Sequence, residues 1–133
     1  MKRTLSLAAC LIAFGMTAFT QEEADYQKWM KTTGATAASL RKNLEAKNAD
    51  GAAGDAKTLQ TVFQQVHDFW HKKGVDDAMK LAMDAGAGFK EVGELASAGK
   101  FDEASASLKK VMGTCAGCHK AHREKAGDGW KIK

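Results

Sequence analysis

Apolar residues recur at steps of three and four from about residue 22 to residue 126, and this spacing constrains the fold more than any other feature of the chain. Such spacing places apolar side chains on one face of an α-helix, whereas a strand requires an alternation that no segment displays. The pattern predicts helices over residues 22–47, 55–73, 75–98 and 101–126. Because short connections favour antiparallel neighbours, we expect an all-α fold, an up-down-up-down four-helix bundle.

Turn and capping residues define the predicted ends of these helices. Residues 48–54 are rich in Asn, Asp and Gly, and Asp55 is placed to cap the second helix. Gly74 and Gly99 are expected to end the second and third helices, because glycine readily adopts the left-handed conformation that terminates a helix. Residues 127–133 are predicted to form a loose tail.

The predicted core follows the apolar stripes of the four helices. Its members are Tyr26, Met30, Thr33, Ala37, Leu40 and Leu44 in the first helix; Leu59, Val62, Phe63, Val66, Phe69 and Trp70 in the second; Met79, Ala82, Met83, Phe89, Val92 and Leu95 in the third; and Phe101, Ala104, Leu108, Val111, Cys115, Cys118 and His122 in the fourth. The third helix also contains Gly86, Gly88 and Gly93. Glycine weakens a helix but lets a neighbouring helix or a cofactor approach closely.

The N-terminus has the pattern of a secretory signal peptide. Lys2 and Arg3 precede an uncharged apolar run over residues 5–19, which is shorter than the roughly 20 residues of a membrane-spanning helix. We expect a signal peptide over residues 1–20 and a periplasmic domain over residues 21–133. An uncleaved anchor is the alternative, whereas lipoprotein cleavage at Cys10 would leave an apolar start on the mature chain.

Length and charge exclude several classes of protein. A chain of 133 residues holds one domain, and its 3 cysteines are too few for a disulfide scaffold. Removal of the signal peptide takes away Lys2, Arg3 and Cys10, which leaves two cysteines and a net charge of +2, from 18 basic and 16 acidic residues. This small excess does not favour nucleic-acid binding.

Cys115, Cys118 and His119 carry the chemistry, in the run Cys-Ala-Gly-Cys-His. Two thiols three residues apart can each add across a vinyl group of haem, and the imidazole that follows can bind the iron. A Cys-x-x-Cys-His run is the attachment signature of c-type haem. On a helix the three residues share the side that bears the apolar stripe. The motif therefore predicts one covalently attached haem c in the bundle core.

Other uses of the two cysteines fit the sequence less well. A thioredoxin-like dithiol needs a strand-to-helix setting, and no strand is predicted. His67 and His71 could join Cys115 and Cys118 in a zinc site, but the second and fourth helices need not be neighbours. A disulfide within one helical turn would close a small, strained ring. We expect His67 and His71 to be a partly exposed pair on their helix.

With the motif near the C-terminus of a predicted four-helix bundle, residues 24–125 resemble the class II c-type cytochromes, the cytochrome c′ group and its low-spin relatives. The run from Cys115 to Arg123, CAGCHKAHR, is similar to the Cys-x-x-Cys-His-x-x-Tyr-Arg ending of that family. The resemblance implies a haem c with His119 as an axial ligand and Arg123 facing the haem propionates. His122 stands where the family often has Tyr, and we expect it to be a solvent-facing packing residue.

The second axial ligand decides the function. In the predicted topology Met30 and His119 each lie about 7 residues, or roughly 10 Å, from the same end of the bundle. Residues 24–30, ADYQKWM, resemble the first helix of His/Met-ligated bundle cytochromes, which implies Met30 as the ligand. The helical pattern alone leaves Met83 and His67 as alternatives, and it also allows a packing role for Met30.

Two functions follow from these alternatives, and neither makes the chain an enzyme. With Met30 bound, the iron is six-coordinate and low-spin, and the protein is a periplasmic electron carrier; this is the preferred interpretation. If Met30, Trp29 and Thr33 only pack against the face of the haem opposite His119, the iron is five-coordinate and high-spin and can bind nitric oxide or carbon monoxide. A homodimer is compatible with the resemblance. An acidic redox partner could be steered by a basic C-terminal region that contains Lys109, Lys110, Lys120, Arg123, Lys125, Lys131 and Lys133.

Overall fold

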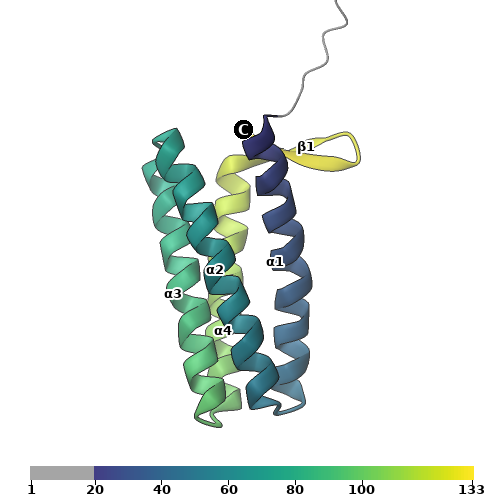
Figure 1. Cartoon of the computed structure of the whole chain (residues 1–133), viewed down its shortest axis with the longest axis vertical. Coiled ribbons are helices and arrows are strands. Elements are labelled where there is room, and N and C mark those ends of the chain that lie inside the picture. Colours follow the sequence, from purple (N-terminus) through teal and green to yellow (C-terminus); the bar gives the residue numbers. More distant parts are fainter. Residues whose placement is uncertain (1–19) are drawn as a thin grey trace, which may run out of the picture.

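Four helices account for most of the protein in a computed structural model that describes residues 20–133. They are α1 (Gln21–Glu45), α2 (Ala49–Lys73), α3 (Asp76–Ser97) and α4 (Phe101–His122). Figure 1 shows them packed side by side as a bundle, with α2 crossing in front of α4. The predicted bundle of four helices is confirmed, whereas the predicted signal peptide lies almost wholly outside the described residues. No helix within residues 20–133 has both the length and the apolar character needed to cross a membrane.

The start of α2 differs from the prediction because a different residue caps it. Asn48 Oδ1 accepts a hydrogen bond from the Gly51 backbone N–H at 3.0 Å, so the helix begins at Ala49 rather than near Asp55. Asp55 lies inside α2 and accepts a hydrogen bond from Asn43 Nδ2 of α1 at 2.8 Å. The first connection is therefore shorter than predicted, and its polar residues link α1 to α2.

Left-handed residues end the first three helices. Gly74 and Gly99 follow α2 and α3 with φ of 67° and 75°, which confirms their predicted role. Lys47 does the same after α1 with φ of 54°, although its Cβ makes this conformation costly. The Asn48 N–H donates to the Asn43 carbonyl at 2.8 Å across this turn. α1 therefore ends with the backbone hydrogen bond of a Schellman motif, in which glycine usually occupies the position of Lys47.

The core lies where the apolar stripes predict it. Every predicted inward residue of α2 is buried, and Leu40, Leu59, Phe89 and Val92 are the largest side chains that are almost completely buried. The predicted core position of Met83 is wrong, because this side chain is 56% exposed on α3. Met30, Cys115 and Cys118 are only partly buried, because they face a cavity described below.

Small residues bring α3 close to both of its neighbours. A Cβ on Gly93 would lie 2.9 Å from the Cβ of Ala56 in α2, and a Cβ on Gly88 would overlap Cγ2 of Val111 in α4. Gly86 has no such constraint. By contrast, α1 and α4 make the fewest contacts of the four adjacent pairs. The bundle is thus tight around α3 and more open between α1 and α4.

The chain ends in a β-hairpin, which the sequence did not predict. α4 ends at His122, and β1 (Arg123–Ala126) pairs antiparallel with β2 (Gly129–Ile132). Gly127, with φ of 58°, occupies the first position of the two-residue turn, where a type II′ turn favours glycine. The predicted extension of the fourth helix to residue 126 and the predicted loose tail are therefore wrong. Figure 1 shows the hairpin projecting beside the start of α1.

Candidate functional site

A cavity of about 310 Å³ lies between α1 and α4, and we call it the main cavity. Its lining extends along α1 from Tyr26 to Arg41 and along α4 from Met112 towards Arg123. α2 and α3 contribute Phe63, Val66, Leu81, Ala82 and Ala85. Most of these side chains are apolar, as is usual for a site that holds a flat organic cofactor.

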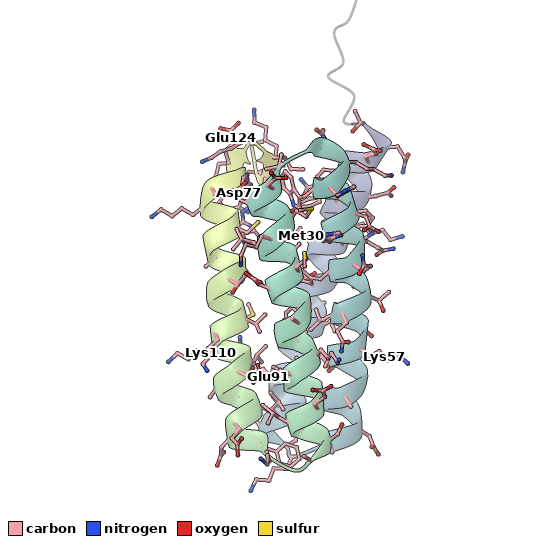
Figure 2. The ribbon with its side chains drawn as sticks, turned by 90° about the vertical axis from the view of Figure 1, so that its left-hand side faces the viewer. Met30, Lys57, Asp77, Glu91, Lys110 and Glu124 are labelled. Carbon is pink, nitrogen blue, oxygen red and sulfur yellow. The ribbon has the colours of Figure 1, made fainter. Side chains whose placement is uncertain are left out.

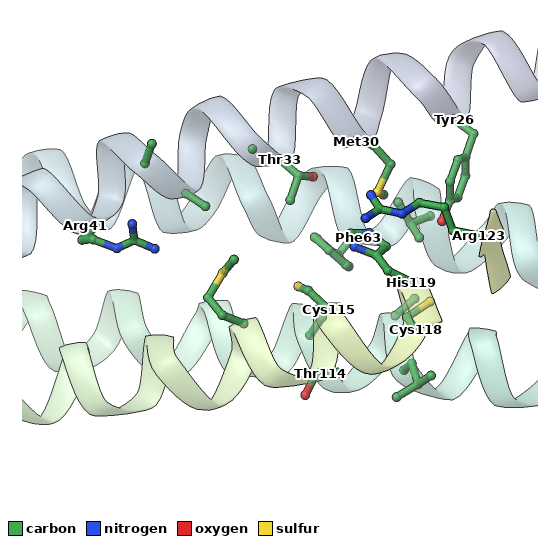
Figure 3. A pocket seen from close by; sticks show the side chains of 18 residues that line it. Tyr26, Met30, Thr33, Arg41, Phe63, Thr114, Cys115, Cys118, His119 and Arg123 are labelled. Carbon is green, nitrogen blue, oxygen red and sulfur yellow. The ribbon is translucent and has the colours of Figure 1, made fainter. Parts of the chain in front are cut away.

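The main cavity brings together the residues that the sequence singled out. Cys115, Cys118 and His119 line it from α4, and Met30 lines it from α1. Figure 3 shows the Met30 thioether and the His119 imidazole reaching into the space between the two helices. A soft sulfur donor and an imidazole therefore face one apolar cavity from different helices.

Both thiols are free, and burial keeps them protonated. Burial, with a smaller effect of Cys118, raises the pKa of the Cys115 thiol to about 11. Burial also raises the pKa of the Cys118 thiol, and the nearby Asp77 carboxylate adds to the effect. A reactive dithiol needs the opposite, a thiolate stabilised by a lowered pKa. These cysteines thus differ from a thioredoxin-like pair.

The environment of His119 favours its neutral form. Burial lowers the pKa of the imidazole, and the positive charge of Arg123 lowers it further. A neutral imidazole has a free nitrogen lone pair, which is the form that binds a metal ion. The electrostatics of the cavity therefore suit His119 to ligation rather than to an ion pair.

Tyr26 lines the main cavity and packs into a cluster of aromatic side chains. The Tyr26 ring lies 4.7 Å from that of Phe69 and 5.7 Å from that of Trp70, and burial raises the pKa of its phenol to about 12. Trp29, which the five-coordinate alternative places beside Met30, packs against Tyr26 and Phe69 and does not line the cavity. Thr33 does line it, and its buried Oγ1 has no hydrogen-bond partner in the described chain.

A second cavity of about 340 Å³ adjoins the first beneath the hairpin. Tyr26, Met30, Cys118, His119 and Arg123 line both cavities, so the two form neighbouring parts of one site. Hairpin residues from Asp128 to Ile132 complete the wall of this second cavity. The hairpin therefore covers the end of the site at which α4 stops.

Arg123 has a second contact that the sequence did not indicate. Its guanidinium lies 3.9 Å from the centre of the Trp130 ring while it also lines both cavities. Gln27 Nε2 of α1 donates to the Trp130 carbonyl at 2.7 Å and ties the hairpin to the bundle. Arg123 thus remains available as a cation at the site, held in place by an aromatic ring.

His122 packs within the protein rather than facing solvent. Its side chain is only 17% exposed, with Nε2 at 2.7 Å from Asp77 Oδ2 and the ring 5.2 Å from that of Trp70. The imidazole hydrogen bond holds the pKa of the Asp77 carboxyl below its usual range. His122 therefore links the end of α4 to the first turn of α3. The packing part of its prediction is confirmed, and the solvent-facing part is wrong.

The alternative ligands lie elsewhere. His67 stacks on His71 at 6.1 Å and approaches Asp68 at 3.0 Å, and it lines a separate groove between α2 and α3 with Met83. Neither His67 nor Met83 lines the main cavity. Within residues 20–133, no group of three or more His, Cys, Asp and Glu side chains could hold a metal ion, so the zinc arrangement is not formed.

The sequence analysis did not indicate seven residues of the main cavity, namely Gly34, Ala38, Arg41, Leu81, Ala85, Met112 and Thr114. Met112 and Arg41 are among them, and Figure 3 shows Arg41 at the end away from Arg123. Met112 does continue the spacing of the fourth helix, but Arg41 has no sequence signal that separates it from other surface cations.

Comparison of the chain with protein-family models, curated proteins and solved structures found no match.

Proposed function

We propose that the protein is an exported c-type cytochrome that carries electrons. In this proposal Cys115 and Cys118 would hold one haem through thioethers, and His119 and Met30 would bind its iron. The observation that supports it is the convergence of Met30 from α1 with Cys115, Cys118 and His119 from α4 on one apolar cavity. Haem supplies a single iron that takes up and releases one electron.

The chain's own residues would favour this role in three ways. The two thioethers fix the cofactor to one turn of α4, because Cys115 and Cys118 lie three residues apart. The apolar walls keep water from the ligands, and a Met ligand opposite His raises the reduction potential. Arg123 offers a positive charge at the edge of the site, which suits carboxylates such as the propionates of haem.

The test begins with covalent attachment. We expect the chain, produced with a system that matures c-type cytochromes, to gain the mass of one haem and to show no free thiol after denaturation. The double variant Cys115→Ser/Cys118→Ser should lose covalent haem entirely. Full covalent loading of that variant would contradict the assignment of the two cysteines.

The second part of the test concerns Met30. We expect low-spin absorption bands in both oxidation states, and high-spin bands after Met30→Ala, because loss of the thioether leaves the iron without its sixth ligand. Met83→Ala is the matched control, since this side chain is 56% exposed and lies outside the cavity. Low-spin bands that survive Met30→Ala would refute the ligand, and high-spin bands in the unmodified protein would favour the alternative function, binding of nitric oxide or carbon monoxide.

A further inference from the structure

The C-terminal hairpin gathers positive charge around an exposed tryptophan. Trp130 is 41% exposed, and its ring lies 3.9 Å from the Arg123 guanidinium and 5.2 Å from Lys125 Nζ. The strand register pairs Lys125 with Trp130 and Arg123 with Ile132, so these four side chains share one face of the hairpin. Lys131 pairs with Glu124 in the register, so it lies on the opposite face, with its Nζ 3.1 Å from Glu124 Oε1. We call Arg123, Lys125, Trp130, Lys131 and Lys133, which cover both faces of the hairpin, the hairpin patch.

The excess positive charge of the described chain lies entirely in this segment. Residues 120–133 contain five Lys and Arg against two Asp and Glu, whereas residues 21–119 contain 13 against 14. Three nearby carboxylates have cationic or imidazole partners: Glu22 lies 4.0 Å from Lys72, Asp77 lies 2.7 Å from His122, and Glu124 lies 3.1 Å from Lys131 within the hairpin. The hairpin is thus a local positive region on a nearly neutral bundle.

The hairpin patch also adjoins the candidate site. Arg123, Trp130 and Lys131 line the second cavity together with Cys118 and His119. The Gln27 hydrogen bond to the Trp130 carbonyl at 2.7 Å holds the patch against α1. A partner seated on the patch would therefore lie next to the residues proposed to bind haem.

We infer that the hairpin patch is the docking surface for an acidic electron-transfer protein. The inference rests on the proposed function, since the exchange moves one electron from the reduced partner to the oxidised site and transfers no atom. Trp and Arg are enriched among the residues that dominate binding energy at interfaces, and clustered positive charge speeds encounter with a negative partner. Both features occur together here, within reach of the site.

The experiment measures binding directly. The haem-loaded, reduced protein is titrated with a reduced acidic blue-copper protein, and with a basic one of similar size, while backbone amide shifts are followed by NMR. We expect the acidic probe to shift residues 120–133 and Lys31, which also lines the second cavity, and the basic probe to bind at least tenfold more weakly. Added salt should weaken binding of the acidic probe.

A matched pair of triple variants distinguishes the effect of the hairpin patch on binding from the effect of the protein's net charge. Lys125→Glu/Lys131→Glu/Lys133→Glu should weaken binding of the acidic probe at least tenfold. Lys57→Glu/Lys109→Glu/Lys110→Glu carries the same charge change on exposed residues, and Figure 2 shows Lys57 and Lys110 far from Glu124 of the hairpin. This control should change the affinity less than twofold. Charge reversal could open the hairpin, so two milder changes are also tested. Trp130→Ala and Lys125→Ala/Lys131→Ala/Lys133→Ala should each weaken binding of the acidic probe as well.

Several results would overturn the inference. Equal weakening by both triple variants would assign the binding to net charge. Shifts confined to residues other than 120–133 and Lys31 would assign it to another surface. Shifts that depend on the protein's own concentration, without probe, would make the patch a contact between copies. Binding to phosphatidylglycerol vesicles but not to the acidic protein would make it a lipid contact. If the chain takes up no covalent haem on maturation and still binds the acidic probe at the hairpin, the proposed function is refuted while the docking surface stands.

Discussion

Gly88→Ala tests whether the close approach of α3 and α4 is required by the fold. Glycine to alanine in a helix interior normally stabilises by about 0.8–1.0 kcal/mol. At Gly88 the new Cβ would overlap Cγ2 of Val111, a buried and branched side chain, and such overpacking costs about 1–3 kcal/mol. We therefore expect a net loss of up to about 2 kcal/mol.

Gly86→Ala provides the control on the same helix. Its Cβ would lie 3.6 Å from Phe63 Cβ, which is an ordinary contact, so only the gain in helix propensity applies. For a domain of this size, about 1 kcal/mol shifts Tm by roughly 4 °C. Gly86→Ala should therefore raise Tm by about 3–4 °C, and Gly88→Ala should lower it by up to about 8 °C. The difference between the two variants isolates the overlap, because propensity contributes equally to both.

Thermal and urea unfolding, followed by far-UV circular dichroism, measure both variants. In a Val111→Ala background the overlap disappears, so Gly88→Ala should change sign and become stabilising. If Gly88→Ala proves as stable as Gly86→Ala, or stays destabilising beside Ala at position 111, the packing argument is wrong.

Two further predictions concern Tyr26 and Lys47. Tyr26 is the only tyrosine, and burial raises its pKa to about 12 from 10.0, so its ultraviolet titration should fall well above pH 10. The folded state holds the phenol proton more tightly than the unfolded state does. The free energy of unfolding should therefore be unchanged below pH 10 and decline between pH 10 and about pH 12. A phenol that titrates near pH 10 in the native protein would contradict this prediction. Lys47→Gly should stabilise by about 0.5–1 kcal/mol in urea unfolding, because Lys47 has φ of 54° and glycine lacks the Cβ that makes this costly. Lys42→Gly, within α1, should destabilise by a similar amount, and a loss of stability in Lys47→Gly would refute the argument.

The parts of the fold that depend on local sequence were predictable. The spacing of Leu59, Val66 and Phe69 fixes which face of α2 is buried, and Gly74 ends the helix through its own conformational freedom. Asn48 and Asp55 were both chemically able to cap α2. Only the contact between Asp55 and Asn43 of another helix shows why Asp55 lies inside it.

The missed features depend on contacts between distant segments. Met83 fits the helical spacing of the core as well as Ala82 does, and only the arrangement of neighbouring helices leaves it exposed. The hairpin has few apolar residues, so its strands carry no alternating pattern. It is held by Trp130 against Arg123 and by Gln27, which is more than 100 positions away in the chain. The motif at Cys115 could be found in the sequence, but the cavity that it faces is a property of the assembled bundle.

The uneven packing of the four helices has a consequence for the order in which the protein forms and opens. α2 and α3 are consecutive in the chain and meet through Gly93 and Ala56, so their pairing needs only a short loop to close. α1 and α4 are the first and last helices of the bundle, and they touch least of the four adjacent pairs. Amide hydrogen exchange should therefore be slowest in α2 and α3 and faster along the boundary between α1 and α4. That boundary contains Cys115 and Cys118, so local opening can expose these two thiols while the rest of the bundle stays folded.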